Sequence, residues 1–169
     1  MNIFFDLDGT LTDSGVGVTG CLQHYVETGM FENELYPGVP EGLESLARDG
    51  RLRTSEFVLK EIERNDAQVY QRVRRLRHHM QIQISPALLR EAGRLALTYP
   101  IMAHVNRDHE TADPWVIAIA KENGYKVICE ESAVKPQRMA WVCTREGVPC
   151  GNIHDLLGAN GIRRRPTKI

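Results

Sequence analysis

The order of apolar and polar positions predicts short strands that alternate with helices. The continuous apolar run Ile3-Phe4-Phe5 ends in Asp and Gly, as a buried strand of a parallel sheet does. A second run, YKVIC over residues 125–129, is followed by two carboxylates, and a last strand is predicted within 148–153. This alternation predicts an α/β fold, a three-layer α/β/α arrangement around a mainly parallel sheet.

Capping and turn residues mark where several helices begin and end. The segment 36–50, YPGVPEGLESLARDG, predicts a turn and then a helix that ends at Gly50, after a weakly helical stretch over 16–26. Thr54 or Ser55 would cap a helix running through Ile62. A terminal helix is predicted from His154.

Two further helices are predicted where a proline occupies the first turn, at Ser85-Pro86 and at Asp113-Pro114. The first of these helices is expected to bury one face, which consists of Leu88, Leu89, Ala92 and Leu95. The second contains WVIAIAK and is apolar nearly all round, so we expect it to be buried on every side.

The composition predicts one globular domain over residues 1–162 and a short basic tail over 163–169. The chain has 42% apolar and 25% charged residues, and its net charge of −1 argues against a protein that coats nucleic acid. No apolar run approaches the roughly 18 residues that span a bilayer, so we expect a cytoplasmic protein without a membrane partner. Cysteines 21, 129, 143 and 150 lack zinc-site spacing and are expected to be reduced, mostly buried thiols.

Glu61 differs from its neighbours in its predicted place on the helix. At about 100° per residue it falls on the apolar face, between Phe57 and Val58, whereas the other charged residues nearby fall on the opposite side. A carboxylate on a buried face needs a partner such as a metal ion, unless it extends to solvent or forms a salt bridge. Glu61 is therefore a candidate ligand.

Other acidic residues follow the strands or begin a helix. Asp6 and Asp8 stand just beyond the first strand, and Glu130 and Glu131 just beyond a later one, where strand alternation lets only one of the two face a site. Asp113 would cap its helix, and helix starts share a sheet edge with strand ends. Carboxylates gathered at that edge would repel one another, so we expect Mg²⁺ or Mn²⁺ to neutralise them.

The stretch DLDGTLTDS, residues 6–14, resembles the first motif of the haloacid dehalogenase-like phosphatases, DxDGTLxDS, and the resemblance covers residues 1–50. It implies that Asp6 is a nucleophile and Asp8 a general acid. Thr54 or Ser55 would then supply the family's Ser or Thr, and Lys135 its lysine. The late acidic pair is incomplete, because Asn152 takes the place of an aspartate and Asp155 stands one residue too close.

From residue 50 onward the chain resembles a different family, the PIN-like domains of bacterial proteins related to toxin ribonucleases. The resemblance rests on GRLRTSEFVLKEIERNDAQVYQRV, on TADPWVIAIAKENGYKVICEES and on WVCTREGVPCGNIHDLL. It implies a PIN-like, Rossmann-like fold in which Asp6, Glu61, Asp113 and Glu131 hold the metal, with Glu130 as the alternative to Glu131. Asp8 stands where that family usually has Asn.

The nuclease interpretation uses a complete set of acids, whereas the phosphatase interpretation lacks its last pair. We therefore expect Asp6 to be a metal ligand, and the protein to be a Mg²⁺- or Mn²⁺-dependent ribonuclease, for example the toxin of a toxin-antitoxin pair. The alternatives are a phosphomonoesterase with Asp6 as nucleophile and an inactive hybrid with a binding role. The expected partners are RNA, an antitoxin protein and a second copy of the chain in a homodimer.

Three other features carry weaker expectations. The basic run RVRRLRHH over 72–79 predicts a solvated helix face or, less often, a surface for phosphates. Trp115 and Trp141 are expected in the core rather than on a base-stacking surface. His104 and His109, which precede the Asp113 helix, are expected to be incidental.

Overall fold

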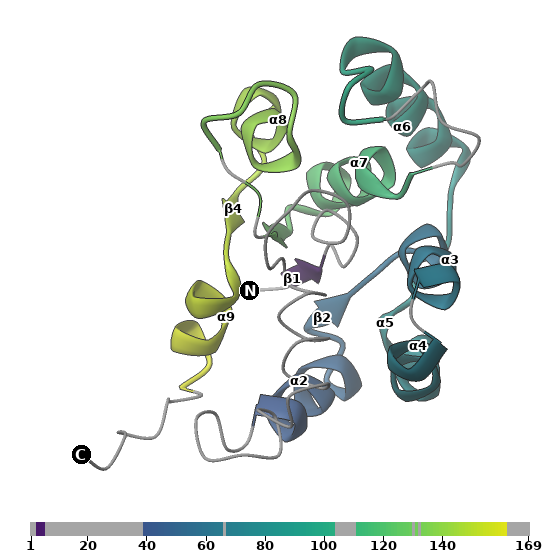
Figure 1. The fold of residues 1–169 in the computed structure, drawn as a ribbon, viewed down its shortest axis with the longest axis vertical. Helices are drawn as coiled ribbons and strands as arrows, with labels where there is room; N and C mark the ends of the chain where they lie inside the picture. The colour runs from purple at the N-terminus through teal and green to yellow at the C-terminus, as the bar shows by residue number, and fades with distance from the viewer. Residues whose placement is uncertain are drawn as a thin grey trace.

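The computed structural model describes residues 3–5, 39–65, 67–103, 111–129, 131 and 133–161, and its strands form one parallel sheet. β1 (Ile3–Phe5) lies between β2 (Leu52–Arg53) and β3 (Lys126–Ile128), and β4 (Cys150–Gly151) pairs with the other side of β3. All three pairings are parallel. The predicted strands and the mixed α/β character are confirmed, and the carboxyl ends of the strands meet at one edge of the sheet (Figure 1).

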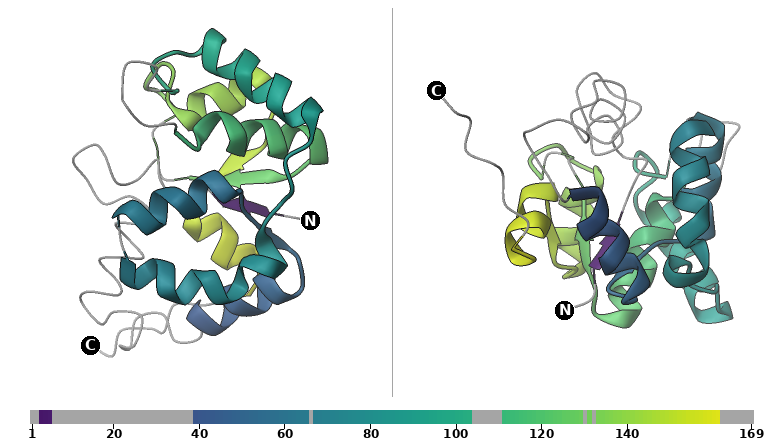
Figure 2. Two further views of the ribbon diagram at one scale, coloured as in Figure 1. Left: turned by 90° about the vertical axis from the view of Figure 1, so that its right-hand side faces the viewer. Right: turned by 90° about the horizontal axis from the view of Figure 1, so that it is seen from below.

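Helices surround this small sheet and make up most of the described chain (Figure 1). α6 lies beside α7, and α3 lies beside α4 (Figure 2, left). None of the described helices is long and apolar enough to cross a membrane. The bounds of the helices are α2 Val39–Arg48, α3 Glu56–Asn65, α4 Ala67–Val73, η1 Arg74–Leu76, α5 Arg77–Met80, α6 Pro86–Thr98, α7 Asp113–Asn123, α8 Met139–Glu146 and α9 Ile153–Ala159.

α7 is the central helix of the hydrophobic core. Every residue from 113 to 120 is buried, because the helix contacts α6, α8, β1 and β3. An apolar surface on all sides is what such a position requires, so the predicted all-round burial is confirmed. The helix ends at Gly124, whose φ of +67° favours glycine, and the chain then enters β3.

α6 departs from its predicted pattern of burial at one position. Leu88, Ala92 and Leu95 are buried, but Leu89 is 57% exposed, so its predicted place on the buried face is wrong. The three buried residues lie three or four positions apart and share one face, whereas Leu89 is turned about 100° from Leu88. In the described part of the chain α7 is the main helix packed against α6, and only the stripe of α6 that faces the core is buried.

The predicted helix starts are largely confirmed. The Ser55 hydroxyl accepts a hydrogen bond from the Val58 N–H at 3.2 Å, so Ser55 rather than Thr54 caps α3. Ser85 caps α6 in the same way through the Leu88 N–H at 3.1 Å. The terminal helix begins at Ile153, one residue earlier than predicted, because Asn152 is its N-cap.

An ion-pair network that the hydrophobic pattern does not reveal joins α6, α7 and α8. Glu146 accepts hydrogen bonds from Arg94 at 2.6 Å, Lys121 at 2.7 Å and Tyr99 at 2.8 Å, and Glu91 accepts from Arg94 and Lys121. Burial alone would raise the pKa of Glu146, but these three donors outweigh it and lower that pKa to about 2. The hydrogen bond from Arg94 lowers the pKa of Glu91 to about 2 as well.

Candidate functional site

Glu61 is buried where α3 meets the start of α7. The residue is only 3% exposed, which confirms its predicted place on the apolar face of α3. Its Oε1 atom accepts a hydrogen bond from the backbone N–H of Ala112 at 2.8 Å, across a separation of 51 residues in the sequence. The Arg64 guanidinium stands 3.9 Å from the same oxygen but is 44% exposed, so solvent screens this ion pair.

Asp113 is the first residue of α7 and is buried as well, at 4% exposure. Its predicted role as N-cap is wrong, because the N-cap is Ala112, which has no side chain able to accept a hydrogen bond. Glu61, which lies on another helix, accepts the hydrogen bond from the N–H of this N-cap residue. In a local capping box the third residue of the same helix supplies that acceptor. The Asp113 side chain is therefore not needed as the cap of α7. Asp113 directly follows Ala112, whose N–H is the group that Glu61 contacts.

An aromatic pair fixes the two helices against each other beside these acids. The Phe57 ring on α3 stacks on the Trp115 ring on α7 with centroids 4.2 Å apart and an interplanar angle of 11°. Phe57 precedes Glu61 by one helical turn, and Trp115 follows Asp113 by two residues. Trp115 is 7% exposed, so its predicted place in the core is confirmed. The stack and the Glu61 hydrogen bond together hold the two acidic residues in the same region.

The charge of this region sets its chemistry. Two acidic side chains are withdrawn from solvent next to the N-terminus of an eleven-residue helix, whose dipole favours negative charge there. Carboxylate oxygens are the ligands that Mg²⁺ and Mn²⁺ prefer. The donors at this position therefore fit a hard divalent cation, although a complete site needs at least one more ligand.

The other predicted ligands are placed differently. Glu131 follows β3, and its carboxylate accepts a hydrogen bond from the Met139 N–H at 2.6 Å, at the start of α8, and lies 3.5 Å from Arg138. Asp6, Asp8 and Glu130 lie outside the described residues. Among the side chains that the structure does describe, no group of three His, Cys, Asp or Glu residues is arranged to hold a metal.

A family model, described as "Domain of unknown function (DUF4411)", matches residues 25–164, which is most of the chain. The chain belongs to the DUF4411 family. No curated protein matches it. Glu61, Asp113 and Glu131 lie inside the DUF4411 match, whereas the phosphatase-like stretch 6–14 lies before it.

Three of the residues that would complete a phosphatase site in this DUF4411 chain take part in helix caps. The Ser55 hydroxyl caps α3. Asn152 and Asp155 form the capping box of α9, in which each side chain accepts a hydrogen bond from the other residue's N–H at 3.0 Å. Lys135 is exposed in a turn. Local structure therefore explains Ser55, Asn152 and Asp155, whereas Thr54, the other Ser or Thr candidate, is buried at 1% exposure.

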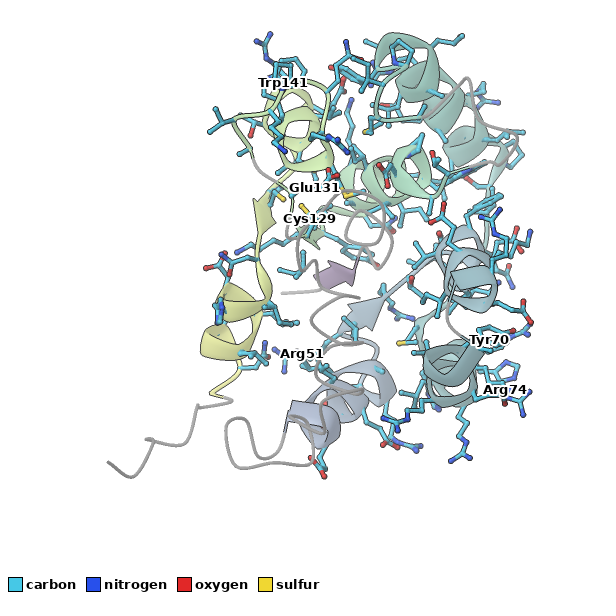
Figure 3. The ribbon with its side chains drawn as sticks, viewed as in Figure 1. Arg51, Tyr70, Arg74, Cys129, Glu131 and Trp141 are labelled. Carbon is cyan, nitrogen blue, oxygen red and sulfur yellow. The ribbon has the colours of Figure 1, made fainter. Side chains whose placement is uncertain are left out.

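The basic run of this DUF4411 chain covers the end of α4, η1 and α5. All of its arginines and histidines are exposed, and they are Arg72, Arg74, Arg75, Arg77, His78 and His79. Figure 3 shows Arg74 and Tyr70 on one side of the molecule, away from Glu131 and Cys129. The predicted solvated face is therefore confirmed, and its side chains are free to meet a polyanion.

The sequence did not indicate that three thiols meet at the end of the sheet. Cys129 and Cys143 are buried and Cys150 is half-buried, which fits the expected buried thiols; Cys21 lies outside the described residues. The sulfur atoms of Cys129 and Cys150 are 3.4 Å apart. Only the register of β3 against β4 could have revealed this proximity, because 21 residues separate the two cysteines in sequence.

Proposed function

We propose that this DUF4411 protein is a divalent-metal-dependent ribonuclease with a three-layer, PIN-like fold. The observation that carries the proposal is the burial of Glu61 and Asp113 at the start of α7, from helices far apart in the sequence. Burying two carboxylates costs free energy unless a counter-charge compensates them, so such residues are candidates for a functional site. We propose that Asp6, which follows β1 directly in the sequence, joins them at the same edge of the sheet.

In this proposal Asp6, Glu61 and Asp113 hold Mg²⁺ or Mn²⁺, and Glu131 or Glu130 completes the set. The ion, when bound, supplies an activated water for attack on an RNA phosphodiester. Glu61 is held in place by its hydrogen bond with the Ala112 N–H, and the Phe57–Trp115 stack packs the two helices together beside it. Glu131 accepts a hydrogen bond from the Met139 N–H and so positions the start of α8. This role does not depend on whether Glu130 or Glu131 is the fourth metal ligand.

RNA is the favoured substrate because of the basic surface over 72–79. Its six exposed cationic or titratable side chains offer sequence-independent contacts to phosphates. A small phosphomonoester would gain nothing from such a surface. The contacts that occupy Ser55, Asn152 and Asp155 also favour the nuclease over the phosphatase. An antitoxin and a second copy of the chain remain proposed partners of this nuclease.

A paired assay separates the proposed activities. The full chain is incubated with Mn²⁺ and either single-stranded RNA or p-nitrophenyl phosphate. The variants are Asp6→Asn, Asp113→Asn and the matched control Asp49→Asn, whose side chain is exposed after α2. We expect RNA cleavage that EDTA abolishes, that falls about a hundredfold in Asp113→Asn, and that is unchanged in Asp49→Asn. Phosphomonoester turnover that survives loss of Asp113 but not of Asp6 would favour the phosphatase instead.

A further inference from the structure

The three thiols at the end of the sheet form a cluster that the proposed nuclease does not use. Cys129 directly follows β3, Cys150 begins β4 and Cys143 lies on α8. Cys150 shares side-chain hydrogen bonds with both Cys129 and Cys143. Buried cysteines often pack as small apolar side chains, but a thiol in contact with two others is also placed for thiol chemistry.

The sheet register accounts for the approach of Cys129 and Cys150. Val127 pairs with Cys150 and Ile128 with Gly151, and the Cys129 N–H donates to the Gly151 carbonyl at 2.9 Å. Residues 127, 129 and 150 therefore share one face of the sheet. The two sulfurs must close from 3.4 Å to the length of a disulfide, about 2.05 Å, which is an approach of about 1.4 Å.

The surroundings of Cys150 make it the more reactive thiol. It is half-buried and so within reach of a small oxidant, whereas Cys129 and Cys143 are buried. The hydrogen bonds from Cys129 and then Cys143 outweigh burial and lower the pKa of Cys150, with help from the nearby Lys126 ammonium. That ammonium lies over the neighbouring Gly151, where an added Cβ would be 2.5 Å from Nζ. The same ammonium also stands 3.6 Å from the Asp155 carboxylate. Partly exposed thiolates close to a cation are the ones that oxidants attack.

We propose that Cys150 and Cys129 form a peroxide-sensitive thiol pair that closes to a disulfide between β3 and β4. The Cys150 thiolate attacks one oxygen of hydrogen peroxide; an S–O bond forms, the O–O bond breaks, and the departing hydroxide takes a proton to become water. The Cys129 sulfur then attacks the Cys150 sulfenic acid; an S–S bond forms, the S–O bond breaks, and hydroxide leaves with the Cys129 proton as a second water. Two thiols are oxidised, and one peroxide is reduced to two waters.

This pair requires no bound metal and no nuclease activity, so it stands independently of the proposed function. Thiol reductants restore it, as they do other intramolecular disulfides. The bond would also tie the segment that carries Glu131 to β4, because Glu131 follows Cys129 by two residues.

Peptide mapping tests the pair directly in the full chain. Trypsin cuts after Lys126, Arg138 and Arg145, and so places Cys129, Cys143 and Cys150 on three separate peptides. The protein is treated with a small excess of hydrogen peroxide, the remaining thiols are alkylated, and the digest is analysed by mass spectrometry with and without reductant. We expect a reductant-sensitive link between the Cys129 and Cys150 peptides, with the loss of two hydrogens.

Single variants separate the roles of the three thiols. Cys143→Ser should retain the link, whereas Cys150→Ser should lower its yield about tenfold or more. Cys129→Ser should leave a sulfenic acid on Cys150 that dimedone traps. A main product linking Cys143 to Cys150 in the wild-type chain, or thiols that all resist excess peroxide, would overturn the proposal. The wild-type digest decides this even if a variant fails to fold.

Discussion

The hydrogen bond between Glu61 and the Ala112 N–H can be isolated with a pair of neutral substitutions. Glu61→Gln keeps an oxygen that can accept from Ala112, whereas Glu61→Ala removes it. Both variants lose the charge, so any relief of repulsion with Asp113 is common to the two. The difference between their free energies of unfolding then measures what the hydrogen-bond acceptor and the packing of the side chain contribute, without a contribution from the charge.

The structure sets the size of this difference. Ala112 is fully buried, so its N–H cannot turn to water when the acceptor is lost. A buried donor left without an acceptor costs about 1–3 kcal/mol, and the truncated side chain leaves a gap as well. We expect Glu61→Ala to be about 3 kcal/mol less stable than Glu61→Gln. At about 2–4 °C per kcal/mol for a chain of this size, the melting temperatures should differ by about 6–12 °C.

Thermal unfolding of the metal-free protein in EDTA measures this difference. Glu63→Gln and Glu63→Ala are the matched controls, because Glu63 is exposed on the same helix, and this pair should differ by less than about 0.5 kcal/mol. If Glu61→Ala melts together with Glu61→Gln, Glu61 does not hold the start of α7, and the account of the site geometry is wrong.

Three further results are expected. The folded pKa values of Glu91 and Glu146 are about 2, below the ordinary 4.5. Their ion-pair network therefore stabilises the fold above about pH 5, and this stabilisation is lost as the pH falls towards 2. In urea unfolding across this range, the free energy of unfolding should depend less steeply on pH in Glu146→Gln than in the wild type. Ser85→Ala should cost about 1 kcal/mol of stability in the same urea assay, and an unchanged midpoint would contradict its capping role. Arg74→Glu combined with Arg75→Glu should weaken RNA binding about tenfold or more at low salt without changing the melting temperature, and an unchanged affinity in a filter-binding assay would exclude this surface.

The sequence predicted those features that depend on local periodicity. The burial of Glu61 followed from its angle on α3, and the burial of α7 from a surface that is apolar all round. Leu89 was misplaced because the width of the buried stripe on α6 depends on what packs against it. The pattern marks a face, but only the neighbouring helix determines how wide that face is.

Features that depend on distant partners could not be predicted. Asp113 precedes a proline and looked like a cap, yet Glu61 from another helix contacts the N-cap N–H of Ala112 instead. Glu131 is predicted as a metal ligand with Glu130 as its alternative, but its contact with the start of α8 depends on the turn between β3 and α8, which the sequence pattern does not show. The meeting of Cys129 and Cys150 depends on strand register in the same way. In each case the sequence shows the residue type but not its partner.

Calorimetric titration of Mn²⁺ into the full chain tests the central claim most directly, because it detects the ion without assuming any substrate. The account predicts saturable binding to the wild type and to the exposed control Asp49→Asn, with an affinity about tenfold weaker or worse in Asp113→Asn. A wild-type chain that binds no Mn²⁺, or an Asp113→Asn variant that binds it equally well, would contradict the account.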